Sequence, residues 1–486
     1  MGINGLSKAI KPIEERASLY ESASKYPAIM VFVYDGPGRP ALKRGRRVQN
    51  SPPFWTAPSM DIVQAFGYYV HQAPGEAEAE LAMLNQHGLL DAVITSDSDV
   101  FVFGATTVYR TIPAKTRRFE DEIAVYTAEN ISNVIGLTKK GLILVALLCG
   151  GDYDAVGLDG CGPATALGLA KCGYGESLIQ IVQTFHGERL TAAIAQWRLD
   201  LQKELFSNSS GHLRGKERSL AKSIPDSFPS LDTLSLYLEP VVSAGASSHL
   251  APVYDFRHRE PSLNRLVMVS STHLGWNTEE IIKDKFKRNV WEGVFLQMLY
   301  SKFILYDHTQ QILATPNIQA RLFNRKIANR AGRMAPNTSR YQARLLVSAQ
   351  NFIALMNPSF QSSTNSDTFR AWVHIDALPE RLLQELSGDT KTTQKADKSR
   401  VMFVEGSSGD SSQQAAAFPE PTKHHRGGIL EALDHMMKGE YASSTTRSLL
   451  IDPNVIDLTE DSDHEKRSIS IPSSLPETEC SIIDLT

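Results

Sequence analysis

Short apolar runs that each end at acidic residues dominate the first third of the chain. Ala28 to Tyr34 reads AIMVFVY and is followed by Asp35, and Ala92 to Thr95 reads AVIT and leads into SDSD. Fully apolar runs of this length predict strands buried on both faces, which are typical of parallel sheets covered by helices. Glu76 to His87, between them, predicts a helix. We therefore expect an α/β fold, with a mostly parallel sheet and helices on both faces.

The chain has 486 residues, more than a single hydrophobic core usually organises. Helical patterns cover Leu178 to Phe185, Leu190 to Leu205 and Thr278 to Met298, and a loop is expected over Asn208 to Ser223. Three strand-like runs, YQARLLVS, FIALM and RAWVHI, then precede a helix-like ALPERLLQEL and suggest a small α+β module. The predicted regions are an α/β core (1–135), a helical extension (136–240), a helical region with a basic linker (241–337), the small module (338–388) and a disordered acidic tail (389–486).

Composition excludes several classes of protein. The sequence has no apolar run of about 18 residues and no signal-peptide pattern, so we expect a cytosolic or nuclear protein without membrane attachment. Four cysteines without a C-x-x-C pair or clustered histidines argue against a zinc site. The formal net charge of -4 arises in the acidic tail, and the rest of the chain is mildly basic. Local clusters must therefore decide whether the chain binds DNA.

Acidic residues stand where the predicted strands and helices begin or end. In an open parallel sheet the loops beyond the strand ends meet at one edge, so these side chains should converge. Converging carboxylates raise one another's pKa unless cations balance them, and oxygen-only donors favour magnesium or manganese. Singly, each has an ordinary explanation, as a helix-dipole partner or a turn residue. The predicted catalytic and metal-binding residues are Asp35, Glu76, Glu78, Asp97, Asp99 and Asp152.

Three segments resemble, in order, the catalytic and DNA-contacting motifs of the XPG and flap-endonuclease superfamily: FVYDGPGRPALKRG, QAPGEAEAELAMLNQHGLLDAVITSDSDVFVFGATTVYR and LLCGGDYDAVGLDGCGPATAL. The resemblance covers about residues 1–205 and is closest to the fungal Holliday-junction resolvases. It implies a nuclear endonuclease that cuts branched DNA as a dimer on the junction. It also implies two Mg²⁺ ions, replaceable by Mn²⁺, with Asp35, Glu76 and Glu78 serving one and Asp97, Asp99 and Asp152 the other. A catalytically impaired junction-binding scaffold and a flap or repair endonuclease are the alternatives.

One expected element of that superfamily has no counterpart near the start of the chain. Members carry a first strand ending in a metal-binding Asp, but only residues 13–27 separate MGINGLSKAIKP from AIMVFVYDG. A parallel βαβ unit needs about 30 residues, so that strand cannot fit there. An exon absent from the coding sequence is the favoured explanation, and a natural protein with an impaired first metal site is the other.

Further segments suggest contacts with DNA. Gly157, Gly160 and Gly162 predict a tight turn that resembles a helix-hairpin-helix element, which can hold a DNA phosphate through K⁺, although a plain turn fits equally. Two basic clusters could neutralise phosphates, with a solvated face, an import signal or a disordered linker as alternatives. Their predicted DNA-binding residues are Lys43, Arg44, Arg46 and Arg47 in the first, and Arg325, Lys326 and Arg330 in the second.

The last third of the chain contains segments that suggest binding to other molecules. The module at 338–388 is similar in position to the chromodomain of the fungal resolvases. VIDLTEDSD and SIIDLT resemble SUMO-interacting motifs, which add a strand to a partner's sheet. The predicted SUMO-interacting residues are Val455, Ile456, Leu458, Ile482, Ile483 and Leu485.

Overall fold

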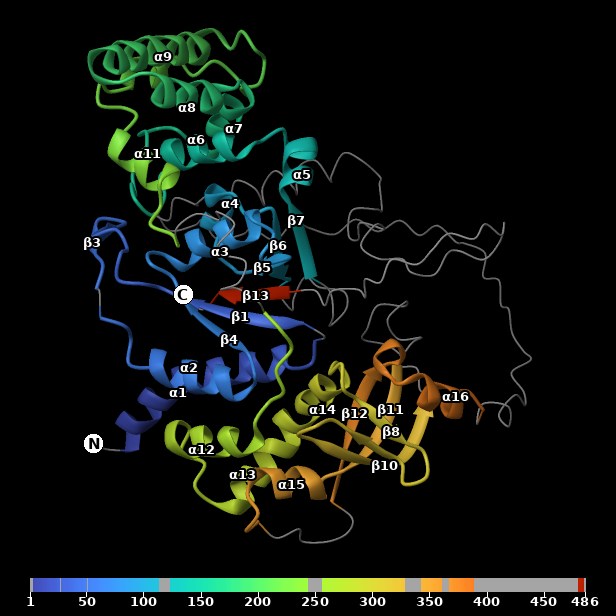
Figure 1. Ribbon diagram of the computed structural model, residues 1–486. Helices are drawn as coiled ribbons and strands as arrows, with labels where there is room; N and C mark the ends of the chain where they lie inside the picture. Colours follow the sequence, from blue (N-terminus) through green and yellow to red (C-terminus); the bar gives the residue numbers. More distant parts are fainter. Residues whose placement is uncertain are drawn as a thin grey trace, which may run out of the picture.

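A computed structural model describes most of the chain, and its described residues form a six-stranded sheet, a five-stranded sheet and a two-stranded hairpin, together with helices (Figure 1). The described residues are 3–26, 28–49, 51–112, 123–243, 256–327, 342–360, 367–388 and 480–484. Among them, no single helix is both long and apolar enough to cross a membrane. One bent pair, Ala128–Ile135 with Lys139–Cys149, meets the length and composition criteria.

The larger sheet has six strands in the order β4-β1-β13-β5-β6-β7. All neighbouring strands are parallel except β6 and β7, which run antiparallel. The expected mostly parallel α/β sheet is therefore confirmed. The strands are β1 (Ile29–Tyr34), β4 (Tyr69–Gln72), β5 (Ala92–Ile94), β6 (Thr107–Thr111), β7 (Ile123–Thr127) and β13 (Cys480–Asp484).

The position of β13 corrects one expectation. The tail was predicted to be disordered, yet Cys480–Asp484 forms a strand between β1 and β5 in the middle of the sheet (Figure 1). Its segment Ser481–Ile483, with two isoleucines, is flanked on both sides by strands that need a partner for their backbone groups. Residues 389–479 lie outside the described residues, so the rest of that prediction stays untested.

Alternate residues of β1 face two different cores. Val31 and Val33 belong to the core that includes α3 (Ala77–Gln86), α4 (Asp99–Phe103) and α6 (Lys139–Cys149). Met30, Phe32 and Tyr34 belong to the core that includes α1 (Ile3–Ala23) and α2 (Thr56–Ala65). We call these two sides of the sheet the α3 face and the α1 face. The period-2 alternation of a strand explains why every residue of β1 is buried although consecutive residues point in opposite directions.

The helical extension lies beyond the α3 face (Figure 1). Its longest helix, α9, spans Gly187–Ser207, and the predicted helices at 178–185 and 190–205 are confirmed. The predicted loop over Asn208 to Ser223 is wrong in its last part, where a short helix forms because Leu220 and Ala221 are buried. The other helices are α7 (Pro163–Lys171), α8 (Tyr174–Thr184), α10 (Arg218–Ser223) and α11 (Leu231–Leu238).

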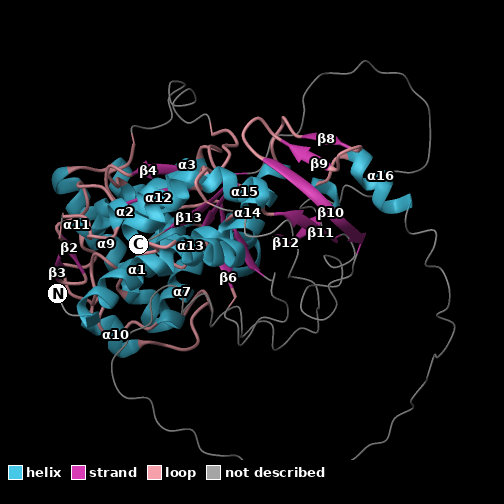
Figure 2. Ribbon diagram, turned by 90° about the horizontal axis from the view of Figure 1, so that it is seen from below, coloured by secondary structure: helices cyan, strands magenta, loops and turns pink. Residues whose placement is uncertain are grey.

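The α1 face is covered further by α12 (Leu263–His273), α13 (Glu279–Lys285) and α14 (Trp291–Leu299). A π-helical turn, Phe286–Val290, joins the last two, so the helix predicted over Thr278 to Met298 is confirmed. Beyond α14 lies a five-stranded sheet in the order β12-β11-β10-β9-β8, grouped at one end of the molecule (Figure 2).

This smaller sheet differs from the expected three-strand module. Its strands begin at Leu305, and they are β8 (Leu305–Asp307), β9 (Ile312–Ala314), β10 (Gln319–Ile327), β11 (Gln342–Ser348) and β12 (Thr368–His374). The run FIALM, expected as a strand, lies instead in helix α15 (Gln350–Met356), where Phe352, Ile353 and Met356 share a buried side. The predicted C-terminal helix is present as α16 (Glu380–Gly388). Identity with a chromodomain stays a prediction.

Candidate active site

The predicted acidic residues stand at the ends of elements along one edge of the larger sheet. Asp35 follows β1, Asp97 lies just after β5, and Asp99 opens α4. Glu76 caps the amino end of α3, Glu78 lies in its first turn, and Asp152 follows α6. Glu76 and Glu78 are each 4% exposed and Asp152 is 7% exposed. Burying charged groups this deeply is costly, so a compensating charge is needed.

A small hairpin supplies part of that charge. Strands β2 (Leu42–Lys43) and β3 (Arg46–Arg47) are joined by Arg44 and Gly45, with φ values of 50° and 70°. The Lys43 ammonium lies between Glu76, with which it forms an ion pair, and Asp152, whose Oδ2 is 3.2 Å away. The structure therefore directs Lys43, predicted to bind DNA, towards the buried acids.

Arg44 ties the same hairpin to Asp152. Its Nη2 lies 2.6 Å and its Nε 2.7 Å from Oδ1 of Asp152, and its backbone N–H donates to the Asp152 carbonyl at 2.6 Å. A left-handed backbone conformation is unfavourable for an arginine, and these contacts hold it in place. Arg46 and Arg47 are exposed, as is Arg44.

The carboxylates interact strongly with one another. Burial, followed by the charges of Asp152 and Asp97, raises the pKa of Asp99 to about 8. Burial lowers the pKa of Lys43, but attraction to Glu76 and Glu78 outweighs it and leaves that pKa above its ordinary value. Negative charge is thus in excess even with Lys43 and Arg44 present. Oxygen donors with surplus negative charge fit a divalent cation of the magnesium type.

Asp35 has a different set of contacts. Its Oδ1 accepts a hydrogen bond from the backbone N–H of Ala77 at 3.0 Å, and its Oδ2 accepts one from Nη1 of Arg39 at 2.9 Å. The first contact fixes the amino end of α3, next to Glu76 and Glu78. Within the described part of the chain, no three acidic, histidine or cysteine side chains form a ready-made metal-binding group.

Two tyrosines border the carboxylates and were missed from the sequence. The Tyr153 hydroxyl donates to Oε2 of Glu76, and burial followed by Glu76 raises the pKa of Tyr153 above its ordinary value. Tyr237 packs against Tyr153 with ring centroids 4.7 Å apart. Both therefore stay protonated, and Tyr153 fixes one oxygen of Glu76. Tyr153 directly follows Asp152 in the sequence, which could have drawn attention to it, whereas Tyr237 lies in a distant helix.

The predicted glycine turn is present between α6 and α7. Gly157 and Gly160 have φ values of 62° and 82°, and Gly162 precedes Pro163, the first residue of α7. A Cβ on Gly157 would lie 2.4 Å from the backbone N of Gly150, so this position requires glycine. Binding of a phosphate or of K⁺ there stays a prediction.

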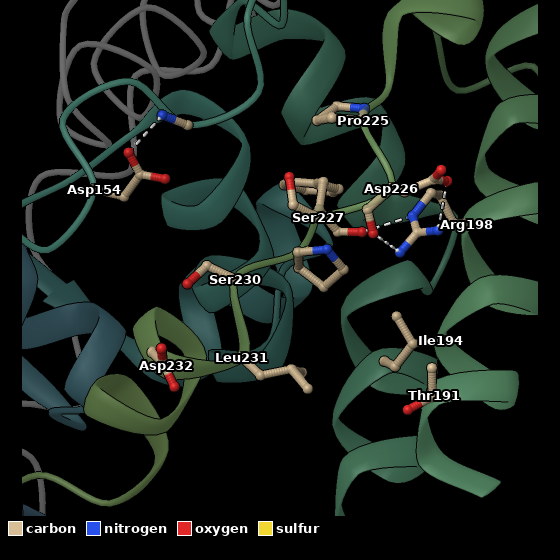
Figure 3. A pocket seen from close by; sticks show the side chains of 13 residues that line it. Asp154, Thr191, Ile194, Arg198, Pro225, Asp226, Ser227, Ser230, Leu231 and Asp232 are labelled. Atoms are coloured by element: carbon tan, nitrogen blue, oxygen red, sulfur yellow. Dashed lines mark hydrogen bonds and ion pairs between the residues drawn. The ribbon is translucent and has the colours of Figure 1, made fainter. Parts of the chain in front are cut away.

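A hollow of about 500 Å³ lies beside this turn and apart from the carboxylates (Figure 3). Asp154 and Gly157 line one side, α9 another, and Pro225–Asp232 the remainder. Arg198 lies at the wall of this hollow. Its Nη1 donates to Oδ1 of Asp226 at 3.2 Å, and its Nε donates to the Phe228 carbonyl at 2.7 Å. None of the six predicted acids lines this hollow, so it is separate from the candidate active site.

The remaining predicted contact residues are only partly described. Arg325 and Lys326 lie on β10, whereas Arg330 lies outside the described residues. Ile482 and Ile483 lie in β13, and Val455, Ile456, Leu458 and Leu485 lie outside the described residues.

Comparison with known proteins adds to this geometry. Residues 67–152 match the XPG I-region family model, which spans five of the six acids. The chain is 37% identical over 134 residues to flap endonuclease GEN-like 1 of Arabidopsis thaliana, covering 27% of this chain and 22% of that protein. It is 30% identical over 240 residues to DNA repair protein RAD2 of Saccharomyces cerevisiae, covering 47% and 21% respectively. The chain spans about a fifth of the length of these relatives.

Solved structures match over more of the chain. The Holliday junction-resolving enzyme GEN1 in complex with product DNA and Mg²⁺ is 25% identical, with a TM-score of 0.58, covering 78% of this chain and 86% of that one. A GEN-1 junction-resolving enzyme with cesium is 24% identical, with a TM-score of 0.60, covering 77% and 85%. An α/β sheet whose acidic edge lies in an XPG I-region defines a nuclease-type fold. The XPG I-region and these similarities agree with the resemblance of the chain to the XPG and flap-endonuclease superfamily.

Proposed function

We propose that this protein is a structure-specific DNA endonuclease that hydrolyses phosphodiesters at branched DNA, with four-way junctions as its substrate. The observation that carries the proposal is the gathering of acidic residues from separate strands and helices at one edge of the sheet, where Glu76, Glu78 and Asp152 are buried. Relatives named as flap endonucleases and a junction-resolving structure with product DNA support the substrate class.

Two Mg²⁺ ions, or Mn²⁺ in their place, would be held by Glu76, Glu78, Asp97, Asp99 and Asp152. Bound metal of this kind lowers the pKa of water and stabilises the leaving oxygen. Asp35, assigned to the first metal on the basis of resemblance, orients the amino end of α3 through the Ala77 N–H. Tyr153 restricts Glu76 by donating to one of its oxygens.

Lys43 and Arg44 have a dual role in this proposal. Without divalent ions they neutralise Glu76 and Asp152. Where metal charge replaces them, both cations can bind phosphates of the cleaved strand, as predicted for this basic cluster. Arg46 and Arg47, exposed on the same hairpin, would contact the neighbouring phosphates.

More distant parts of the protein would hold the duplex arms. The glycine turn with Gly157, Gly160 and Gly162 offers backbone N–H groups for a phosphate, with K⁺ as a possible bridge. The basic strand β10, with Arg325 and Lys326, would extend this contact to another arm. Assembly as a dimer on the junction, nuclear localisation and binding of SUMO belong to the same proposal.

Cleavage of labelled branched DNA tests this function. Wild-type protein with Mg²⁺ should nick four-way junctions symmetrically, and Asp97→Asn should bind them without cutting. A matched control, Asp284→Asn, changes a side chain that is paired with Arg288 on an exposed helix and should cut normally. Preference for single flaps would reject junction resolution.

A junction-binding scaffold without activity is the second candidate. The ion pairs of Lys43 and Arg44 with the acids favour it, since two cations already occupy the site. Wild-type protein that binds junctions tightly but does not cut them with Mg²⁺ or Mn²⁺ would support this alternative.

A further inference from the structure

Strand β13 begins at residue 480, far along the chain from the other strands of its sheet. It nevertheless has a neighbouring strand on each side. Its five residues pair in parallel with Ile29–Val33 of β1 on one side. On the other side Ser481, Ile482 and Ile483 pair in parallel with Ala92, Val93 and Ile94 of β5. Without β13, strands β1 and β5 would each present an unpaired edge in the interior of the molecule, which is costly for buried backbone groups (Figure 1).

The register of β13 agrees with the division of the sheet into two faces. Residues paired between parallel strands lie on the same face. Ile482 is level with Val31 and Val93, which both belong to the core of the α3 face. Ile483 is level with Phe32 and Ile94, which pack in the core of the α1 face. Each isoleucine is therefore level with apolar residues of both neighbouring strands.

Asp484 has a different place in the same register. It is level with Val33, on the α3 face, at the carboxyl end of the strand. The residue before it pairs with Ile94, which immediately precedes the loop to Asp97 and Asp99. Helix α3, which begins after Glu76 and carries Glu78, runs next to β13. The strand thus ends at the edge where the other acids gather.

We propose that Cys480–Asp484 is an internal complementing strand, which completes the nuclease sheet within one molecule and brings residue Asp484 to the edge of the sheet where the acids gather. The inference rests on the proposed function for the role of Asp484, but not for the role of the strand. The long connection through 389–479 does not oppose it, because the entropy of closing a loop grows only slowly with length.

Insertion in the sheet has a consequence for partner binding. A SUMO-interacting motif works by adding a strand to the partner's sheet. Because both edges of Ser481–Ile483 are paired inside this protein, a partner could take the segment only by withdrawing it. Capture of SIIDLT and an intact nuclease sheet are therefore mutually exclusive.

Hydrogen exchange tests the strand itself, without reference to activity. Deleting 480–486 from the full chain should increase amide exchange in Ile29–Tyr34 and Ala92–Ile94 at least about tenfold. Deleting the related block 455–459 is the matched control and should leave both segments protected. Equal protection of β1 and β5 in wild-type protein and in the 480–486 deletion would overturn the proposal.

A second pair of variants tests Asp484 while leaving the strand in place. Asp484→Asn should keep the protection of β1 and β5 but weaken Mn²⁺ binding, measured by calorimetry, by at least the roughly tenfold loss typical of changes around a metal site. Asp457→Asn, in the other IDLT block, should bind Mn²⁺ as wild type does. Unchanged Mn²⁺ binding in Asp484→Asn, with binding lost in Glu78→Gln, would refute the role of Asp484 and leave the proposed function standing. Unchanged binding in both variants would refute the proposed function.

Discussion

The two faces of the six-stranded sheet use the same strands for different purposes. On the α1 face, Phe32 is fully buried, with Tyr20 and Tyr68 rings at 4.9 Å and 5.5 Å between centroids. On the α3 face, an equally buried core ends at a group of carboxylates, where burial and the charges of Asp152 and Asp97 raise the pKa of Asp99. Buried groups with a strongly perturbed pKa are typical of functional sites, so the difference between the two faces supports the proposed site at the acidic edge. Substitutions on the α1 face should therefore affect folding, and those at the acidic edge should affect catalysis.

The largest effect is expected from Phe32→Ala. Removing a fully buried ring from the α1 face should lower the free energy of unfolding by about 3–5 kcal/mol, because a cavity remains among the aromatic neighbours. Urea unfolding followed by fluorescence measures this change. The protein that remains folded should retain its cleavage activity. A fall of less than about 1 kcal/mol in the free energy of unfolding would contradict the close packing around Phe32.

The matching change on the α3 face is Glu78→Gln. It should lower the rate of DNA cleavage by roughly 10²–10³-fold, about 2.7–4 kcal/mol in the barrier, comparable to the loss of one preorganised electrostatic group. Its free energy of unfolding without metal should fall less than that of Phe32→Ala, since Gln keeps the side-chain volume and the lost attraction to Lys43 leaves no cavity. A cleavage rate equal to that of wild type, or a marked fall in the free energy of unfolding, would contradict the distinction between the two faces.

A smaller loss is expected at the polar contact within the α1 face. The Ser59 hydroxyl lies 2.5 Å from the Tyr20 hydroxyl and 2.6 Å from that of Tyr34, with all three residues buried. Ser59→Ala would leave these phenols with only their mutual 3.4 Å contact, so unfolding should become easier by about 1–3 kcal/mol. Thermal melting with Ser59→Thr as the conservative comparison checks this value.

An effect of a different kind is expected in chelator, where the free energy of unfolding should depend on pH. The Asp99 pKa is about 8 in the folded protein and near the ordinary value of about 4 when unfolded, so the folded state binds more protons between these values. Stability of the metal-free protein should therefore fall as pH rises from about 4 to 8. Asp99→Asn should flatten this slope, and Asp284→Asn, at a partly exposed residue, should keep it. An unchanged slope in Asp99→Asn would show that Asp99 ionises normally.

Much of this arrangement could be predicted from short segments of the sequence. The apolar runs of β1 and β5, the helix after Glu76 and the acids at their ends required no knowledge of distant segments. FIALM misled the prediction because a short apolar run is compatible with either a strand or a helix. Partner choice was not predictable: nothing local to SIIDLT indicates pairing with β1 and β5, and nothing local to Lys43 indicates contact with Glu76.

Titration with Mn²⁺ tests most directly whether acids from separate elements form one cation site. Calorimetry on the folded full chain should detect divalent-ion binding that disappears in the double variant Glu78→Gln, Asp97→Asn, while circular dichroism shows both proteins to be equally folded. Binding of the same strength in wild type and double variant, or none in the wild type, would contradict the account.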